Sequence, residues 1–189
     1  MRQKEARADA TPSFDRRVTA SELQSALDVT EGELDLTKGQ LDRALRVIDY
    51  SGRYDVPADL AGDIYDIALA EGIEPELGFR LVRIESEFNE RATSPVGAIG
   101  LTQLMLPTAK YFQKGVTRES LYDRRTNLRV GFRYLRVLIR ESKGDIKLAL
   151  LVYNRGPVAV NAARAKGLDP ANGYDRMVMT GYKGKGVID

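Results

Sequence analysis

One acidic side chain stands where the sequence predicts that a helix meets a loop. Apolar residues recur at helical spacing at Leu77, Leu81 and Ile84, and the loop-like stretch NERATSPVGAIG follows a few residues later. Glu85 therefore falls near the end of the helix, between a packed face and a cleft lined by the loop. Partial burial there would disfavour the charged form of its carboxyl, which makes Glu85 the candidate acid/base group.

Two further carboxylates lie close to Glu85 in the sequence, and neither is expected to share its cleft. Glu87 is two positions along, about 200° round a helix, so its side chain should point away. Glu90 falls in the loop. We interpret both as solvent-facing charges, which leaves a site with one carboxylate.

The chain contains no cysteine, histidine or tryptophan. Without thiols or imidazoles it has no disulfide, no thiol nucleophile, no Ser-His-Asp triad and no zinc site of the usual kind. Acid/base chemistry must therefore fall to Asp, Glu, Lys or Tyr. We expect neither a metal nor an organic cofactor.

The elements that position these residues are predicted to be helical. From residue 58 onward the apolar positions follow helical spacing, with almost no strand-like alternation. Helices are expected at about 58–72, 75–86, 127–141 and 145–153, with one more before a tail rich in Gly and Lys. The sequence thus predicts an all-α fold with at most a minor β-hairpin.

Three regions follow from composition and pattern. Residues 1–18 are polar, lack the apolar core of a secretory signal and are expected to form a disordered leader. Residues 19–56 are expected to form a helical extension or hairpin, which begins at a capping box of Thr19 and Glu22. The stretch GRYDVP indicates a break, and residues 57–189 are expected to form the main domain.

An apolar seam marks the N-terminal extension, where Leu27, Leu34, Leu41 and Ile48 are spaced seven residues apart. Two glycines lie among them, and each costs about 1 kcal/mol in a helix interior relative to alanine. The pattern is compatible with a coiled coil, a broken helix or a two-helix hairpin. Because an exposed seam of this length is an aggregation liability, we expect it to pack within the chain.

Charge is distributed unevenly along the chain. Residues 1–76 hold 9 Lys and Arg against 17 Asp and Glu, whereas residues 77–189 hold 20 against 10. The basic part should attract an anionic partner, and we expect no nucleic-acid binding because no motif for it is present. A row of arginines on helix 127–141 either serves this attraction or forms a solvated face: Arg129, Arg133, Arg136 and Arg140.

Three short motifs, in order, make the chain recognisable. They are Glu85-Ser86, then Gly100-Leu101-Thr102-Gln103, then Val152-Tyr153-Asn154-Arg155-Gly156-Pro157. Together they resemble the lytic transglycosylase SLT domain family, whose pattern is a catalytic Glu-Ser, then Gly-Leu-Met-Gln, then Ala-Tyr-Asn-Ala-Gly-Pro. The resemblance extends from about residue 59 to about residue 178. Departures at Thr102 and Arg155 concern the glycan preference rather than catalysis.

The resemblance implies a lysozyme-like fold and an enzyme that cleaves peptidoglycan between N-acetylmuramic acid and N-acetylglucosamine. Glu85 would protonate the glycosidic oxygen while the substrate's own 2-acetamido group attacks C1, so no second carboxylate is needed. Glu85 would then accept the proton of the C6 hydroxyl, which closes a 1,6-anhydro ring without consuming water.

The resemblance also implies roles for residues around the cleft. Tyr153 matches the tyrosine that hydrogen-bonds the catalytic Glu, with a core tyrosine as the alternative. Met105 is expected to line the cleft wall, and Tyr174 resembles a later cleft tyrosine. The positions expected to hydrogen-bond sugar or acetamido groups, with capping or turn roles as the alternative, are Ser86, Gln103 and Asn154. The glycines expected to serve backbone geometry are Gly97, Gly100 and Gly156.

Two other functions remain open from the sequence. One is a glycan-binding or scaffold module without catalysis, and the other is a lysozyme-type hydrolase, which would need a second acid in the cleft. No stretch is apolar enough to span a membrane. Because peptidoglycan strands lie outside the cytoplasm, we expect action in the periplasm or cell envelope, by a natural form that carries a signal peptide, lipid or membrane anchor. Delivery by a secretion machine or a phage particle is the alternative.

Overall fold

The structure is a computed structural model that describes residues 19–188, so the predicted disordered leader, residues 1–18, lies outside it. The described residues form helices, and their only strand-like pairings are isolated bridges such as Thr93–Ile99 and Ile99–Leu104. The predicted all-α class is therefore confirmed. No helix among these residues is both long and apolar enough to cross a membrane. The elements are α1 (Ala20–Tyr54), α2 (Ala58–Ala70), α3 (Pro75–Ser86), α4 (Leu106–Phe112), the 3-10 helix η1 (Glu119–Tyr122), α5 (Arg124–Glu141), α6 (Ile146–Arg155), α7 (Pro157–Ala165) and α8 (Tyr174–Met179).

The chain divides into two compact units, residues 1–44 and residues 45–189. In the first unit, α1 begins at the predicted capping box. The Thr19 amide donates to Glu22 Oε2 at 2.8 Å, and the Glu22 amide donates to Thr19 Oγ1 at 3.2 Å. Helix α1 then continues without interruption to Tyr54, so of the predicted alternatives the chain forms the helical extension and not the hairpin or the broken helix. The break falls in the second half of the predicted stretch GRYDVP, since α1 ends at Tyr54 and α2 begins at Ala58.

The seam on α1 is exposed. Among residues 19–188, the packing within the chain that the sequence predicts for these side chains is not seen. The exposed fractions are 51% for Leu27, 52% for Leu34, 58% for Leu41 and 65% for Ile48.

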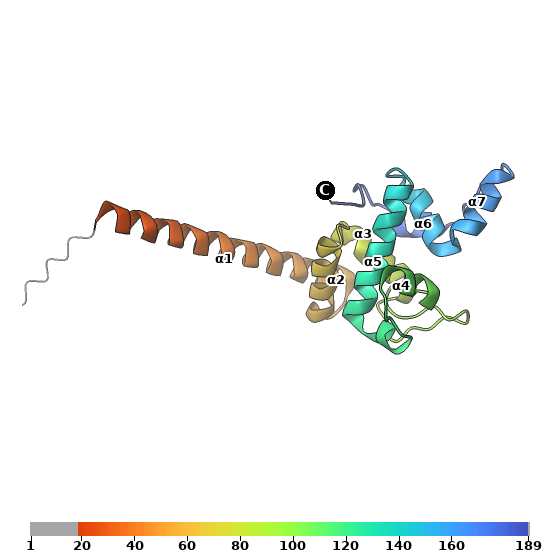
Figure 1. Cartoon of the computed structure of the whole chain (residues 1–189), viewed down its shortest axis with the longest axis horizontal. Coiled ribbons are helices and arrows are strands. Elements are labelled where there is room, and N and C mark those ends of the chain that lie inside the picture. Colours follow the sequence, from red (N-terminus) through yellow and green to blue (C-terminus); the bar gives the residue numbers. More distant parts are fainter. Residues whose placement is uncertain (1–18, 189) are drawn as a thin grey trace, which may run out of the picture. The chain divides into compact units, whose positions relative to one another are not determined.

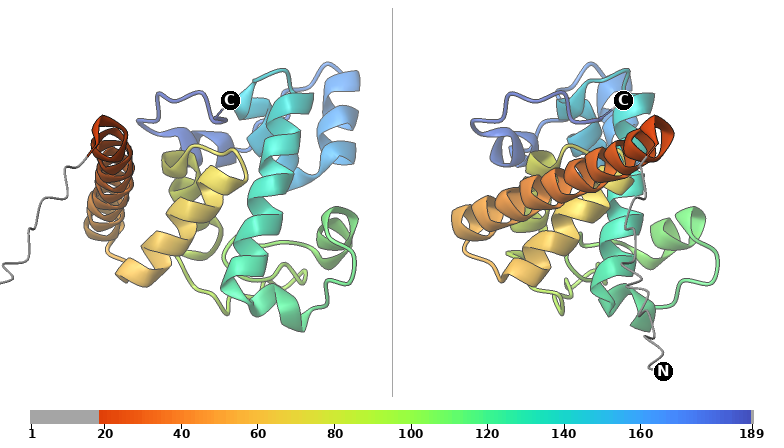
Figure 2. Two further views of the ribbon diagram at one scale, coloured as in Figure 1. Left: turned by 60° about the vertical axis from the view of Figure 1, so that its left-hand side comes forward. Right: turned by 90° about the vertical axis from the view of Figure 1, so that its left-hand side faces the viewer.

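Helix α5 is the centre of the second unit, as Figure 1 and the left view of Figure 2 show. It packs against α2, α4 and α6, while α3 packs against α2 and α8, and α6 against α7 and α8. Asp123 caps α5 by accepting from the Thr126 amide at 2.8 Å. The largest side chains fully buried between these helices include Phe79, Phe132, Ile64, Leu77, Leu81, Leu128 and Leu135.

The last turns of α1 belong to the second unit. Val47 is buried, and the ring of Tyr50 stacks on Phe79 with centroids 4.3 Å apart. The compact unit therefore begins at Leu45, whereas the sequence predicts the boundary between residues 56 and 57. The reason is that aromatic stacking recruits helical turns that precede the predicted break in the chain.

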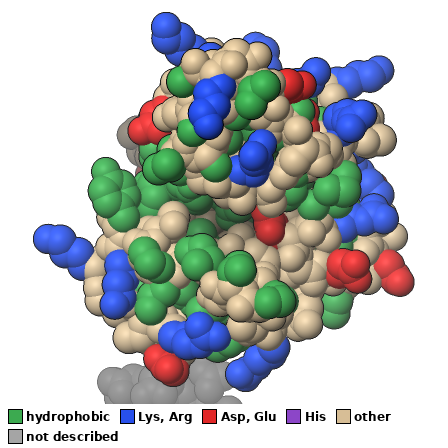
Figure 3. All heavy atoms as spheres, turned by 90° about the vertical axis from the view of Figure 1, so that its right-hand side faces the viewer, with side chains coloured by type: hydrophobic (Ala, Val, Ile, Leu, Met, Phe, Trp, Pro, Cys, Tyr) green, Lys and Arg blue, Asp and Glu red, His purple; other side chains and the backbone are tan. Residues whose placement is uncertain are grey.

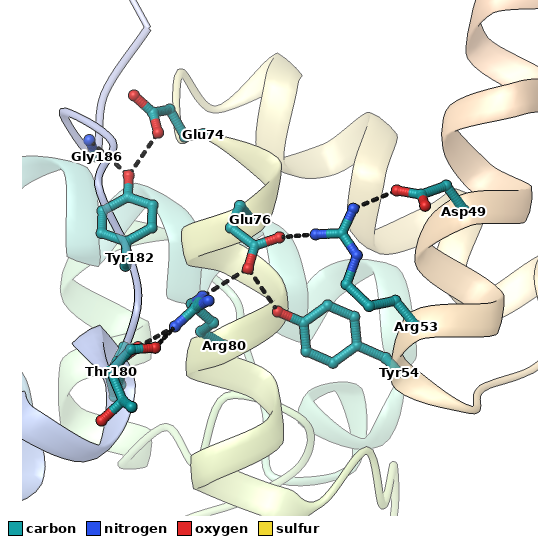
Figure 4. A network of polar contacts seen from close by, with 10 residues as sticks. Asp49, Arg53, Tyr54, Glu74, Glu76, Arg80, Thr180, Tyr182 and Gly186 are labelled. Atoms are coloured by element: carbon teal, nitrogen blue, oxygen red, sulfur yellow. Dashed lines mark hydrogen bonds and ion pairs between the residues drawn. The ribbon is translucent and has the colours of Figure 1, made fainter.

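A polar network at the start of α3 ties these turns to the chain end (Figure 4). Glu76 accepts hydrogen bonds from Arg53 Nη1 at 2.6 Å, from the Tyr54 hydroxyl at 3.1 Å and from Arg80 Nε at 2.6 Å. Arg80 in turn donates to the carbonyl of Thr180, which follows α8. The network fixes α3, the helix that carries Glu85, at the end opposite to that residue.

The arginine row on α5 is divided between two uses. Arg133 donates to Glu71 from Nε at 3.0 Å and from Nη2 at 2.7 Å, and Arg136 Nη2 lies 3.8 Å from the same carboxylate. Arg129 and Arg140 are exposed. Half of the row therefore pairs with a buried acid of the same chain, and the other half faces solvent.

Candidate active site

Glu85 occupies the predicted place at the end of a packed helix. Pro75 starts α3, and the chain leaves the helix through Glu87 and Phe88, which have φ of 51° and 63°. This left-handed turn ends the helix at Ser86, one residue after Glu85. The Glu85 carboxyl is partly buried, and Oε1 accepts a hydrogen bond from the hydroxyl of Tyr174.

The environment of Glu85 favours a protonated carboxyl. Burial raises the pKa of Glu85 to about 7, and the hydrogen bond from Tyr174 opposes the rise in part, because it stabilises the charged form. The pKa responds to no second carboxylate among residues 19–188. A carboxyl with a pKa near 7 can both deliver and accept a proton near neutral pH.

Tyr174 is held in place by a short chain of side chains. It is the first residue of α8 and is 4% exposed. Its amide donates to Asn172 Oδ1 at 3.2 Å, and Asn172 Nδ2 donates to Asn154 Oδ1 at 2.9 Å. Asn154, a predicted sugar-binding residue, thus connects the end of α6 to the residue that contacts Glu85.

Tyr153 makes a different contact from the one that the resemblance implies. Its hydroxyl donates to the backbone carbonyl of Thr102 at 2.8 Å, so Tyr174 rather than Tyr153 hydrogen-bonds Glu85. The physical reason is that the Tyr153 ring packs against Tyr134, with centroids 5.0 Å apart, which directs its hydroxyl to the loop. Tyr153 is still near Glu85. Burial raises the pKa of the Tyr153 phenol, and the negative charge of Glu85 raises it further.

The loop between α3 and α4 is fixed by side chains that the sequence analysis assigned to substrate. The Ser86 hydroxyl donates to the carbonyl of Leu101 at 2.8 Å, and Gln103 Nε2 donates to the carbonyl of Gly100 at 2.9 Å. These are the turn roles that the sequence left as the alternative. Gly100 has φ of 74°, and a Cβ there would lie 2.7 Å from the Leu121 carbonyl oxygen, which agrees with its predicted backbone role.

Asn127 is a site-supporting residue whose contacts sequence reasoning missed. Its Oδ1 accepts from the Thr102 amide at 2.8 Å and from the Thr102 hydroxyl at 2.7 Å. Its Nδ2 donates to the carbonyls of Ile99 and Leu121, both at 2.9 Å. Thr102, which stands where the family has Met, is fully buried and therefore does not face a sugar. A polar residue among the core-facing positions of α5 is the signal that could have identified Asn127.

Four of the predicted residues line one cavity of about 340 Å³, namely Gln103, Met105, Tyr153 and Asn154. Met105 is 40% exposed and is available to a ligand. Figure 3 shows a hollow on one face of the molecule, with hydrophobic side chains along its walls and an acidic side chain within it. An apolar wall with a few polar groups is typical of a site for a neutral or weakly charged ligand.

The two carboxylates near Glu85 in the sequence either pair with an arginine or face solvent. Arg124 donates to Glu90 Oε1 from Nε at 2.9 Å and from Nη2 at 2.5 Å. Glu87 is exposed, as expected. Among residues 19–188, no group of three or more His, Cys, Asp or Glu side chains is placed to hold a metal ion. The site is therefore built on one carboxyl, two tyrosines and a polar loop.

Comparison with known proteins shows the family of this chain. Residues 64–172 match the model of the transglycosylase SLT domain family. A transglycosylase of Enterobacteria phage PRD1 is 42% identical over 89 residues, which cover 47% of this chain and 32% of that protein.

Two solved structures share the fold. The lytic transglycosylase Slt from Pseudomonas aeruginosa, solved as an inactive mutant, is 27% identical, with a TM-score of 0.53 over 61% of this chain and 21% of its own. The 70 kDa soluble lytic transglycosylase from Escherichia coli is 24% identical, with a TM-score of 0.56 over 69% of this chain and 24% of its own. The chain thus spans about a third of the curated relative, and a quarter or less of these two structures.

Proposed function

The chain belongs to the transglycosylase SLT family, and we propose that it is a peptidoglycan lytic transglycosylase with Glu85 as its acid/base. The bond cleaved is the β-1,4 linkage between N-acetylmuramic acid and N-acetylglucosamine. The product is a glycan end that carries a 1,6-anhydro ring. The observation that carries the proposal is a partly buried carboxyl whose pKa is about 7 and whose hydrogen-bond partner is a neutral hydroxyl.

In the first step, the protonated Glu85 donates its proton to the glycosidic oxygen. This oxygen is a poor leaving group until it is protonated, and a pKa near 7 leaves about half of the Glu85 side chains protonated at neutral pH. As the C1–O bond breaks, the carbonyl oxygen of the 2-acetamido group attacks C1 and forms a cyclic oxazolinium-type intermediate. The substrate thus supplies the nucleophile, which suits a site whose neighbouring acids are exposed or paired.

In the second step, the Glu85 carboxylate accepts the proton of the C6 hydroxyl. O6 then attacks C1, the acetamido oxygen leaves, and the 1,6-anhydro ring closes. Glu85 regains its proton, so the enzyme returns to its starting state and no water is consumed. The Tyr174 hydroxyl supports the carboxylate between the two steps, since its hydrogen bond stabilises the charged form.

Substrate binding falls to the cavity beside Tyr153. Met105 offers an exposed apolar surface against which a sugar face packs, and Asn154 and Gln103 offer amide groups to acetamido and hydroxyl groups. Ser86 and Gln103 also hold the loop, so their effect on binding is in part indirect. Tyr174 joins the site through Glu85 rather than through the cavity wall.

The partner in this proposal is the peptidoglycan glycan strand, and the place of action is the periplasm or cell envelope. The exposed arginines Arg129 and Arg140 add a basic surface to α5. Anionic strands are attracted to such a surface at low salt.

Digestion of purified peptidoglycan, followed by mass spectrometry of the products, tests the proposal. A lytic transglycosylase releases 1,6-anhydromuropeptides, which are one water lighter than the products of a hydrolase. Reducing ends would indicate a lysozyme-type hydrolase, and strand binding without cleavage would indicate a glycan-binding module. The matched control is Glu85→Gln, which keeps the shape of the side chain but has no acidic proton to donate.

A further inference from the structure

Helix α1 presents a row of apolar side chains whose spacing suits a second helix. Leu27, Leu34 and Leu41 are more than half exposed and lie seven residues apart. In the heptad notation of coiled coils these residues take the a positions. The d positions between them are filled by smaller residues, namely Thr30, Thr37 and Ala44.

The two threonines do not make this surface polar. The hydroxyl of Thr30 donates to the carbonyl of Ala26, and that of Thr37 donates to the carbonyl of Glu33, both at 2.8 Å. Each hydroxyl is thus satisfied within its own helix, and burial of the side chain leaves no polar group unpaired. The row therefore alternates large and small side chains, all of which can be buried.

A partner on the row would also stabilise the helix itself. Gly32 and Gly39 each cost about 1 kcal/mol relative to alanine in a helix interior. Both fall at f positions, on the side away from the row, and a Cβ built on either meets nothing within 4 Å. In proteins, packing of an apolar face supplies most helical stability, so a partner on this face would offset the cost of the two glycines.

Charge along α1 determines which arrangement suits the partner. Residues 22–35 contain five Asp and Glu and no Lys or Arg, whereas residues 36–48 contain three Lys and Arg and one Asp. A parallel pair would set the acidic segments of two copies side by side. An antiparallel pair sets each acidic segment beside a basic one, which favours association.

We propose that α1 forms an antiparallel two-helix coiled coil with α1 of a second copy of this chain. In this register Leu27 packs against Ala44 of the second copy, Leu34 against Thr37, and Leu41 against Thr30, so each of these three layers joins a large side chain to a small one.

The same register brings opposite charges together beside the apolar layers. Glu31 and Lys38 both occupy e positions, which face each other in an antiparallel pair, and the two-fold symmetry produces this ion pair twice. Within its own helix Lys38 lies 3.5 Å from Asp35 Oδ1, with both side chains highly exposed, so that contact is weak and leaves Lys38 able to reach the partner.

Light scattering of the full chain tests the association. The expected mass is that of two chains. Leu34→Asn raises the dimer dissociation constant by about a hundredfold or more, because both copies lose a central leucine. The matched control is Leu36→Asn, since Leu36 is 65% exposed on the same helix but occupies a c position outside the row. A full chain with the mass of one copy at every concentration overturns the proposal, as does equal sensitivity to the two substitutions.

Disulfide crosslinking tests the direction of the pair, because the natural sequence has no cysteine. The double variant Leu27→Cys/Ala44→Cys is expected to form a covalent dimer under oxidising conditions, and each single variant is not. A covalent dimer of Leu27→Cys alone would indicate parallel helices and contradict the proposal. If the chain stays monomeric and sediments with phosphatidylcholine vesicles, the apolar row on α1 binds a membrane surface. This result would also contradict the proposed dimer.

Discussion

Helices α2 and α3 each end near a buried or partly buried carboxylate, and the two carboxylates have different neighbours. Glu71, which follows α2, accepts two hydrogen bonds from Arg133 and lies near a second arginine. Glu85, in the last turn of α3, receives one hydrogen bond from the hydroxyl of Tyr174. A cation favours the charged form of an acid, whereas burial beside a neutral donor favours the protonated form. The comparison separates an acid that holds the fold together from an acid equipped to transfer a proton.

The largest expected effect is the loss of turnover in Glu85→Gln. Glutamine keeps the shape and can accept the hydrogen bond from Tyr174, but it can neither deliver a proton nor take one. Because one residue serves both steps, we expect a loss of about 10⁴-fold or more in the release of anhydromuropeptides, with folding and strand binding retained. Glu87→Gln is the control, since Glu87 is exposed and should change turnover by less than about twofold. An active Glu85→Gln beside an inactive Glu87→Gln would reverse the assignment of the acid.

Glu71→Gln should instead reduce stability. The substitution leaves Arg133 without its carboxylate, and we expect a loss of about 3 kcal/mol, at the low end for a buried pair because Arg133 is about a third exposed. Turnover of the molecules that remain folded should stay close to that of the parent. Urea denaturation at neutral pH measures the loss of stability. Turnover is measured separately and divided by the fraction of molecules that remain folded. A stable but inactive variant would make Glu71 part of the catalytic apparatus and remove the contrast with Glu85.

Glu85→Gln should raise stability in a manner that depends on pH. The pKa of Glu85 is about 7 in the fold against an ordinary value of 4.5, so between these values the folded state binds the proton more tightly than the unfolded state. The parent therefore loses stability as pH rises through this window, and the variant does not. The advantage of the variant should be absent below pH 4.5 and reach about 3 kcal/mol above pH 7. Melting curves of the parent and of Glu85→Gln at both ends of this pH window measure the effect, with Glu87→Gln as the reference. A difference in stability that is the same at both pH values would contradict the expectation.

The activity of the parent should fall on the alkaline side of neutrality. The first step needs the protonated form of Glu85, and this fraction decreases about tenfold per pH unit above the pKa of about 7. A profile of turnover against pH, measured on soluble glycan strands at constant ionic strength, should show this limb. A profile that stays flat to pH 9 would mean that a different group supplies the proton.

Tyr174→Phe should reduce turnover less than Glu85→Gln does, and it should also shift the pH profile of activity. The hydrogen bond from Tyr174 lowers the pKa of Glu85, so its removal moves the alkaline limb of the activity profile to higher pH. Turnover falls by about tenfold, because the Glu85 carboxylate loses a hydrogen bond that stabilises it. Tyr153→Phe is the matched control, since its hydroxyl donates to the Thr102 carbonyl. A limb that moves in Tyr153→Phe and not in Tyr174→Phe would restore the role that family resemblance assigns to Tyr153.

The sequence was sufficient where local pattern determines structure. The capping box at Thr19 and the placement of Glu85 at a helix end both follow from spacing of a few residues. The continuity of α1 did not follow, because two glycines weaken a helix without fixing where it ends.

Contacts between distant segments could not be read from the sequence. Tyr174 contacts Glu85 across 89 residues, and Arg133 pairs with Glu71 across 62. Each depends on how α8 or α5 packs in the finished fold. A tyrosine that hydrogen-bonds the acid was expected from the family pattern, but whether this role falls to Tyr153 or Tyr174 is decided by ring packing.

The central claim is that one carboxyl performs both proton transfers and that no water enters the products. Digestion of peptidoglycan by the parent chain in water labelled with heavy oxygen tests it most directly. We expect anhydro ends whose mass is the same in labelled and ordinary water. Reducing ends that carry the heavy oxygen would contradict it, because a water activated by a second group would then be the nucleophile.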